Sequence, residues 1–255
     1  MALQIVTIPC LADNYAFLAH DPATGATAAV DVPEAEPILA ALHARGWTLS
    51  DVLLTHHHAD HVQGLGELLA KAPARVIGAA ADAHRLPPLD QAVAGGDTVQ
   101  VGRETGHVIE VPGHTLGHIA FHFPQSGVAF TGDSLMALGC GRVFEGSMAQ
   151  MHASLARLAA LPPETQVCSG HEYTAANARF AVTIDPDNPR LATRLREIEV
   201  ARAENRPTVP SRLEEELATN PFLRAHDPSI RARLGMEGAT DADVFAEIRG
   251  RKDRF

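Results

Sequence analysis

The chain has 255 residues, of which 45% are hydrophobic, enough for one large domain or two modest ones with a buried core. Its formal net charge of −10 argues against non-specific binding to nucleic acid or to an anionic membrane surface. The first residues lack the basic segment of a signal peptide, and no apolar run reaches the length that spans a bilayer.

Strand-like and helical patterns alternate along the first two thirds of the chain. Short apolar runs predict strands at residues 5–8, 15–18, 28–31 and 75–78. Apolar residues at helical spacing predict helices at residues 34–45, 61–71 and 148–161. This mixture is typical of two sheets flanked by helices.

Strand signals disappear after residue 173. Helical patterns cover residues 175–182, 189–205, 211–218 and 241–249. The segment Ser211-Arg212-Leu213-Glu214 has the form of a capping box, which predicts a helix start. We therefore expect a first domain over residues 1–173 and a smaller, all-helical domain over residues 174–255.

The stretch Thr55-His56-His57-His58-Ala59-Asp60-His61 carries side chains that bind metals, directly after residues 51–54, which we interpret as the end of an apolar strand. Neutral imidazole and carboxylate are ligands that zinc, iron and manganese accept. Residues two apart in an extended backbone point the same way, so His56 and His58 can close on one ion. Asp60 and His61 lie beyond the turn and can face a second position. A chance histidine run on a solvated loop would rarely place four such residues within six positions.

Three further metal-capable residues follow other apolar runs, each beside a glycine. They are His114, Asp133 and His171. Ligand sites in open α/β arrangements collect beyond the carboxyl ends of strands, so we expect these residues to join the first group. A lone histidine in this setting is more often structural, but several together favour a metal site.

These motifs resemble the metallo-β-lactamase superfamily and, within it, glyoxalase II, the hydroxyacylglutathione hydrolases. The similarity rests on the segments THHHADH, PGHTLGH, TGDSL and SGHEYT and on the ending RGRKDRF. The first motif is shared by lactamases, lactonases, nucleases and dioxygenases, whereas the C-terminal features narrow the resemblance to glyoxalase II. It implies an α/β protein, an αββα sandwich followed by the smaller helical domain.

The resemblance also implies a centre with two divalent ions, with zinc expected first and iron or manganese accepted by the same ligands. In this family pattern, His56, His58 and His114 hold the first ion, Asp60, His61 and His171 hold the second, and Asp133 bridges them. One subclass of true lactamases has a cysteine in the second site, but here Cys140 comes too late and Asp133 takes that role. We interpret His57 and His118 as supporting or packing residues. A ligating imidazole usually has its other nitrogen held by a partner, and Thr55 or Asp31 can serve.

The implied activity is hydrolysis of the thioester of S-(2-hydroxyacyl)glutathione, typically S-D-lactoylglutathione, to a 2-hydroxy acid and glutathione. This is the second step of methylglyoxal detoxification. A hydroxide shared by the two metals would attack the carbonyl, and we expect Asp60 and Asp133 to act in catalysis. A thiolate leaves readily, so a dedicated general acid is less necessary than in amide hydrolysis.

Glutathione carries carboxylates, so its site needs local cations on this acidic protein. By resemblance, Arg249 and Lys252 bind the glycine carboxylate, and Arg142 stands where some relatives have lysine. Tyr173 matches the family tyrosine, whereas Phe144 stands where some relatives carry a tyrosine and lacks that hydroxyl. The alternative for Arg249 and Lys252 is a solvated helix end, where cations favour the helix dipole.

Two other functions stay open at this point. One is another enzyme of the superfamily, such as a persulfide dioxygenase with one iron or a lactonase; the helical tail and its Arg249 and Lys252 end argue against it. The other is a non-catalytic metal-binding or scaffold protein, which the full ligand set disfavours. The expected partner is a small-molecule thioester, without nucleic acid or membrane, and we expect a monomer.

The cysteines indicate the compartment. Cys10, Cys140 and Cys168 are odd in number and lack paired spacing, which predicts free thiols in a reducing compartment and hence a cytoplasmic protein. We expect Cys10 and Cys168 to be buried strand residues rather than catalysts.

Overall fold

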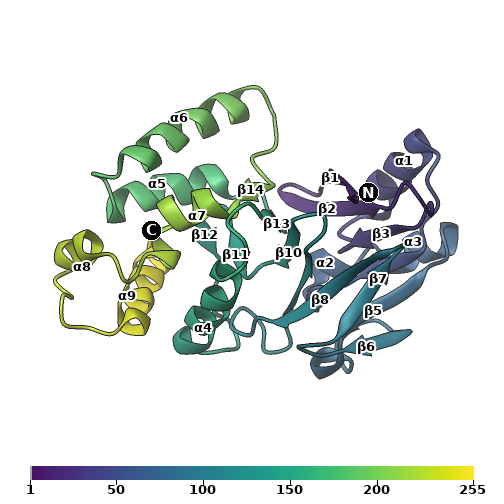
Figure 1. Ribbon diagram of the computed structural model, residues 1–255, viewed down its shortest axis with the longest axis horizontal. Helices are drawn as coiled ribbons and strands as arrows, with labels where there is room; N and C mark the ends of the chain where they lie inside the picture. The colour runs from purple at the N-terminus through teal and green to yellow at the C-terminus, as the bar shows by residue number, and fades with distance from the viewer. Residues whose placement is uncertain (1) are drawn as a thin grey trace. The chain divides into compact units, whose positions relative to one another are not determined.

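The structure is a computed structural model that describes residues 2–255 (Figure 1). The chain divides into two compact units. The first comprises residues 1–110 and 116–132, and the second comprises residues 111–115 and 133–255.

The first unit contains a six-stranded sheet in which the strands follow one another in chain order. Its strands are β1 (Gln4–Cys10), β2 (Asn14–His20), β3 (Thr27–Val30), β4 (Asp51–Leu53), β5 (Arg75–Ala79) and β6 (Gln91–Val93). The pairs β1–β2 and β2–β3 are antiparallel, and the pairs from β3 to β6 are parallel. Parallel neighbours need crossover connections, and here these include α1 (Ala35–Arg45), α2 (Ala59–Val62) and α3 (Leu65–Lys71). The carboxyl ends of β3 and β4 therefore meet at one edge, which brings Asp31 beside the loop that begins at Leu54.

An antiparallel meander completes the first unit. Its strands are β7 (Thr98–Val101), β8 (Glu104–Glu110), β9 (Ile119–Phe123) and β10 (Val128–Gly132). The ring of Phe17 on β2 lies 5.6 Å from that of Phe130 on β10, and Phe121 and Phe123 are fully buried. These aromatic contacts show that the two sheets pack face to face around an apolar core.

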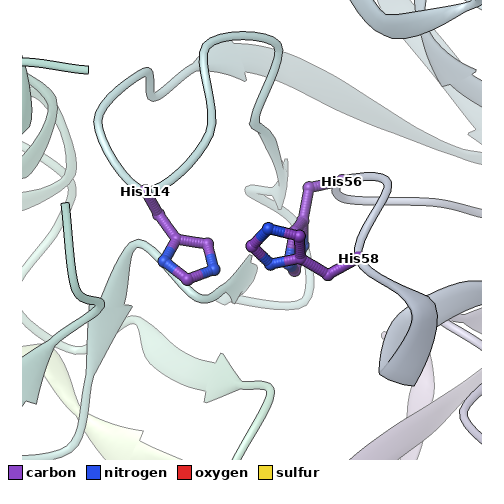
Figure 2. A group of neighbouring side chains, drawn as sticks. All are labelled: His56, His58 and His114. Carbon is purple, nitrogen blue, oxygen red and sulfur yellow. The ribbon is translucent and has the colours of Figure 1, made fainter. Parts of the chain in front are cut away.

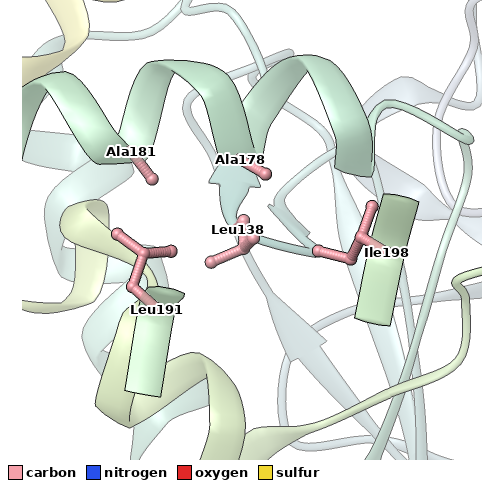
Figure 3. Close-up of a cluster of buried hydrophobic side chains, with 5 residues drawn as sticks. All are labelled: Leu138, Ala178, Ala181, Leu191 and Ile198. Carbon is pink, nitrogen blue, oxygen red and sulfur yellow. The ribbon is translucent and has the colours of Figure 1, made fainter. Parts of the chain in front are cut away.

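The second unit is mainly helical. Its strands are β11 (Leu135–Met136), β12 (Gly139–Cys140), β13 (Gln166–Ser169) and β14 (Ser211–Arg212). Its helices are α4 (Met148–Ala159), α5 (Thr174–Ile184), α6 (Pro189–Ala203), α7 (Leu213–Thr219), α8 (Pro228–Leu234) and α9 (Asp241–Asp253), with a short 3-10 turn, η2, at Pro221–Leu223. A cluster of buried apolar side chains joins α5 and α6 to Leu138, the residue between β11 and β12 (Figure 3).

Most predicted elements are confirmed to within a few residues, but three expectations were wrong. The helix expected over residues 61–71 is two helices, because the chain turns at Gly64, where a Cβ would lie 2.9 Å from the backbone of Glu34. A strand does occur after residue 173, since β14 pairs antiparallel with β13. Ser211 lies in that strand, and α7 begins at Leu213 after Arg212, whose side chain makes no capping hydrogen bond, so the predicted capping box does not form.

The helix α8 was missed. Asp227 caps its start, Pro228 occupies the first helical position and Gly235 ends it in the left-handed conformation. Those signals stand in the sequence, but a seven-residue helix offers too few turns for a clear apolar periodicity. The domain boundary near residue 173 stays a prediction.

Candidate metal centre

The loop after β4 brings together the imidazoles predicted to bind metal in the first unit. The ring centroid of His56 lies 4.8 Å from that of His58 and 4.2 Å from that of His61. Asp60 lies in the first turn of α2, and its Oδ2 is 3.8 Å from Nε2 of His61. His56 and His61 are fully buried, which is costly for polar rings unless they have partners.

Asp31 supplies the support for two of these rings. Its Oδ2 accepts hydrogen bonds from Nδ1 of His61 and from the Thr55 hydroxyl, both at 2.8 Å, and its Oδ1 accepts from the Thr55 amide at 2.8 Å. Because the Thr55 hydroxyl donates to Asp31, its oxygen accepts from Nδ1 of His56 at 3.0 Å. Both imidazoles therefore carry their proton on Nδ1 and present the lone pair of Nε2, as metal ligands do. We assign Asp31 as a support for the ligands because its carboxylate accepts three hydrogen bonds. The carboxylate also lies close enough to His56 and His61 to be considered a metal ligand itself.

The second unit contributes His114, Asp133 and His171. Oδ2 of Asp133 lies 3.5 Å from Nε2 of His114 and 3.2 Å from Nε2 of His171. Nδ1 of His114 donates to the Arg142 carbonyl at 2.7 Å, so this ring too presents Nε2. Gly141 permits the arrangement, because a Cβ there would lie 2.0 Å from the Asp133 carbonyl oxygen and 3.0 Å from Nδ1 of His114.

Besides the group of Asp31, His56 and His61, two further groups of potential ligand atoms occur, each with its atoms within 4.8 Å of one another. One consists of His56, His58 and His114, which Figure 2 draws. The other consists of Asp60, His61 and His171. Imidazole nitrogens and carboxylates with ordered hydrogen-bonding partners are a donor set that fits divalent metal ions.

The residues expected to bind substrate all lie in the second unit. Phe144 and Tyr173 expose their rings, at 60% and 38%. The Phe144 ring lies 5.3 Å from that of His114, and the Tyr173 ring stacks on that of His171 at 4.5 Å. Arg142 lies over Phe144, and its Nε is 3.3 Å from Oδ1 of Asp253.

Arg249 does not lie on a solvated helix end, because only 5% of its surface is exposed. Its Nη1 donates to the Cys140 carbonyl at 2.9 Å, its Nη2 donates to Asp253 at 3.0 Å, and its guanidinium lies over the Phe222 ring. Lys252 is partly buried, with Nζ 3.4 Å from the Ala176 carbonyl. Burial, together with the charges of Arg249 and Arg179, lowers the pKa of the Lys252 ammonium. The helix α9 runs through both residues, as expected for cations that share one face.

Sequence reasoning missed three residues around these groups. Asn14 donates from Nδ2 to Oδ2 of Asp60 at 3.0 Å. Asp82 lies 2.9 Å from Nδ1 of His57, and Asp253 joins Arg142 to Arg249. Asn14 and Asp82 stand far from the motifs in sequence and carry no pattern of their own, whereas Asp253 lies four residues after Arg249, a spacing typical of helical ion pairs.

His57 is held by Asp82, and the His118 ring stacks on that of His56 at 4.6 Å, which suits supporting and packing residues. All three cysteines are free, as predicted, and the expected burial of Cys10 and Cys168 is confirmed; Cys140 is buried as well. Among the described residues, no helix is both long enough and apolar enough to cross a membrane.

Two protein-family models together match almost the whole chain. Residues 21–171 match the metallo-beta-lactamase superfamily, and residues 172–255 match the hydroxyacylglutathione hydrolase C-terminus. A hydroxyacylglutathione hydrolase of Cereibacter sphaeroides is 66% identical over 255 residues, which cover 100% of both chains. The chain belongs to the hydroxyacylglutathione hydrolases.

Other similarities agree with membership of this glyoxalase II family. A hydroxyacylglutathione hydrolase of Jannaschia sp. is 65% identical over 252 residues, which cover 99% of this chain and 98% of the relative. The crystal structure of the B3 metallo-beta-lactamase BLEG-1 superposes with a TM-score of 0.67 at 20% identity, covering 86% of this chain and 99% of that one. At that identity the likeness shows the fold alone. The predicted fold is confirmed: a metallo-beta-lactamase fold with two sheets, followed by a helical C-terminal region.

Proposed function

We propose that this glyoxalase II chain hydrolyses the thioester of S-(2-hydroxyacyl)glutathione, with S-D-lactoylglutathione as the typical substrate. The products are a 2-hydroxy acid and glutathione, as in the second step of methylglyoxal detoxification. The observation that carries the proposal is the donor set, in which hydrogen bonds from Nδ1 leave the lone pairs of Nε2 for metal on His56, His61 and His114.

We assign the ligands as the family motif implies. His56, His58 and His114 hold the first ion, Asp60, His61 and His171 hold the second, and Asp133 bridges both. The carboxylate of Asp133 between two imidazoles supports the bridging role. Zinc is the expected metal, and iron or manganese suits the same donors.

Bound divalent ions would supply a water of lowered pKa and a Lewis acid for the thioester carbonyl. The residues provide orientation. Asn14 holds Oδ2 of Asp60, so Asp60 can direct its other oxygen to accept a hydrogen bond from the attacking water. Oδ2 of Asp133 lies within 3.5 Å of Nε2 of His114 and of His171, so a bound ion would hold the carboxylate and both rings together.

The substrate would contact Arg142, Phe144, Tyr173, Arg249 and Lys252. The exposed rings of Phe144 and Tyr173 beside His114 and His171 support apolar contacts with the acyl group or the thiol arm. Lys252 can approach a carboxylate with its partly buried ammonium. Arg249 can do so only by sharing the guanidinium that now binds Asp253 and the Cys140 carbonyl.

Residues 1–173 would then form the catalytic domain and residues 174–255 the substrate-binding domain. The two family models, which meet at residues 171 and 172, support this boundary. We also propose a cytoplasmic monomer. Three free, buried cysteines support a reducing compartment.

The test is steady-state hydrolysis of S-D-lactoylglutathione together with metal analysis of the purified protein. We expect turnover that a chelator abolishes and two bound ions per chain. Asp133→Ala should lower kcat by at least about 10²-fold, on the order of 3 kcal/mol of barrier stabilisation, and reduce bound metal. Asp187→Ala is the matched control, because that carboxylate is 93% exposed and also lies in the second unit. Near-normal turnover with two bound ions in Asp133→Ala would contradict the binuclear mechanism, and oxygen uptake with glutathione persulfide in place of hydrolysis would favour a dioxygenase.

A further inference from the structure

The hairpin β11–β12 is separated from Asp133 by Ser134 alone and leads into Gly141 and Arg142. Its position therefore bears on two parts of the proposed metal centre. The amide of Gly141 donates to the Ser134 carbonyl, and the Arg142 carbonyl accepts from Nδ1 of His114. Any movement of the hairpin would displace the carboxylate of Asp133 and the support of His114.

Side chains from the helical region bind the backbone at the tip of this hairpin. Oε2 of Glu216 accepts from the Leu138 amide at 2.8 Å, and Glu216 has no exposed surface. Nδ2 of Asn220 donates to the Met136 carbonyl at 3.1 Å and to the Gly139 carbonyl at 3.0 Å. Nδ2 of Asn177 donates to the Ala137 carbonyl at 3.1 Å.

The tip adopts a conformation that needs such contacts. Leu138 has a φ of +55°, a left-handed conformation that is unfavourable for a residue with a large side chain. Its side chain is fully buried among Ala178 and Ala181 of α5 and Leu191 and Ile198 of α6 (Figure 3). Backbone and side chain are thus both held by the C-terminal helices.

The residues that bind the tip are fixed in turn. Arg194 pairs with Oε1 of Glu216 and donates to the Thr219 hydroxyl at 2.8 Å. Asn220 also donates to Oε2 of Glu216 at 3.1 Å. Because these groups are buried and hydrogen-bonded to one another, they form a rigid support rather than a set of independent contacts.

We propose that Glu216, Asn220 and Asn177 are positioning residues for the metal centre, acting through the hairpin at residues 135–140. The inference rests on the ligand assignment above. It gives the C-terminal region a second role besides substrate binding. None of the three belongs to the assigned ligand set, and they act by fixing Asp133 and the carbonyl that orients His114.

The test compares Asn220→Ala with Asn188→Ala. Asn188 is a buried asparagine of the same helical region that donates to Asp185 and to the Ala218 carbonyl and caps α6, but it does not contact the hairpin. Zinc is titrated into the metal-free form of the wild type and of each variant, with a chromophoric chelator as competitor, and thermal unfolding of each protein is measured in parallel. We expect Asn220→Ala to bind zinc about 10–100-fold more weakly, the usual range for a residue that supports metal ligands, and Asn188→Ala to bind zinc like the wild type although its melting temperature falls.

Equal zinc affinities for the two variants would overturn the proposal, because Asn220 would then be a structural residue like Asn188. If Asn220→Ala does not fold, Asn177→Ala replaces it, since Asn177 makes one contact with the hairpin tip and is less central to the network. Wild-type zinc affinity in a folded Asn177→Ala would then refute the proposal. Zinc affinity is measured without substrate, so this comparison remains valid even if the chain does not hydrolyse the proposed thioester.

Discussion

A substitution at Asp31 is the most direct test of how hydrogen bonds in the first unit orient the metal ligands. Its carboxylate accepts three hydrogen bonds, one from His61 and two from Thr55, and through the Thr55 hydroxyl it also fixes His56. The substitution Asp31→Asn keeps the size of the side chain. Asparagine also tolerates the φ of +56° found at this position, so backbone strain does not confuse the result.

The magnitude follows from the number of donors that face the side chain. An amide has one accepting oxygen, which would best face His61 and the Thr55 hydroxyl. Its NH₂ group then faces the Thr55 amide, which loses its acceptor. A buried donor without a partner costs about 1–3 kcal/mol of stability. The neutral oxygen also supports the imidazoles less strongly than a carboxylate does, so we expect about 10–100-fold weaker metal binding, or roughly 1.4–2.8 kcal/mol.

The control is Thr55→Val, which removes the hydroxyl between Asp31 and His56 but leaves the direct bond from His61 to Asp31. Metal-free protein of each variant is titrated with zinc, and the affinities of both sites are compared with those of the wild type. Asp31→Asn should weaken both sites, whereas Thr55→Val should weaken mainly the site that contains His56. If folded Asp31→Asn bound both ions within about twofold of the wild type, Asp31 would not support the ligands and the tautomer assignment would be wrong.

Three further predictions concern the second unit. Lys252→Ala should raise KM for the glutathione thioester about tenfold with kcat unchanged, because a remote carboxylate contact contributes equally to ground and transition states, and a small neutral thioester should show no difference. Arg249→Ala should instead lower the free energy of unfolding by about 2–3 kcal/mol, measured by urea denaturation, because its guanidinium donates hydrogen bonds to the Cys140 carbonyl and to Asp253. If the stability of this variant were unchanged, Arg249 would serve substrate binding alone. Burial would raise the pKa of Asp227, but hydrogen bonds from Ser229 and Arg224 outweigh it and lower the pKa to about 2, below the unfolded value of 3.8. Its stabilisation is therefore present above pH 3.8 and lost as the pH falls through about 2, so Asp227→Ala should be about 1–2 kcal/mol less stable than the wild type in urea denaturation at pH 7 and about equal to it below pH 2. A difference that persists at the lowest pH would contradict this account.

The motif around His56 could be predicted from sequence because strand geometry dictates it. A strand end followed by alternating side chains brings His56 and His58 to one side, and the structure places their rings 4.8 Å apart. The parallel order β3-β4-β5 likewise follows from alternating strands and helices. Local pattern and chain connectivity were sufficient for these features.

Of the supporting contacts, only those of Thr55 and Asp31 were expected as alternatives from the sequence, and the structure shows that both residues hold ligating imidazoles. Asp31 lies 24 residues before Thr55 and 30 before His61, and Asn14 lies 46 before Asp60. Single asparagines and aspartates carry no periodicity, so only the folded structure shows which of them meet a ligand. The short strand β14 was missed for a related reason, since two residues offer no alternation to detect and the pairing partner β13 lies more than 40 residues away.

Residues that are far from the metal ligands in sequence can support them, so substitutions at such residues can affect metal binding. Glu216 and Asn220 lie 78 to 84 residues from the hairpin atoms that they bind, yet those atoms belong to Met136, Leu138 and Gly139, in the hairpin that follows Asp133. Buried groups in such a network have defined positions because each fixes the next, and a single truncation leaves others without partners. A defect in metal binding can therefore arise from a residue in α7 that no ligand motif includes. Conversely, the exposed ion pairs of the same region, such as Arg212 with Glu214, bind no part of the hairpin and should be replaceable with little effect on either metal binding or stability.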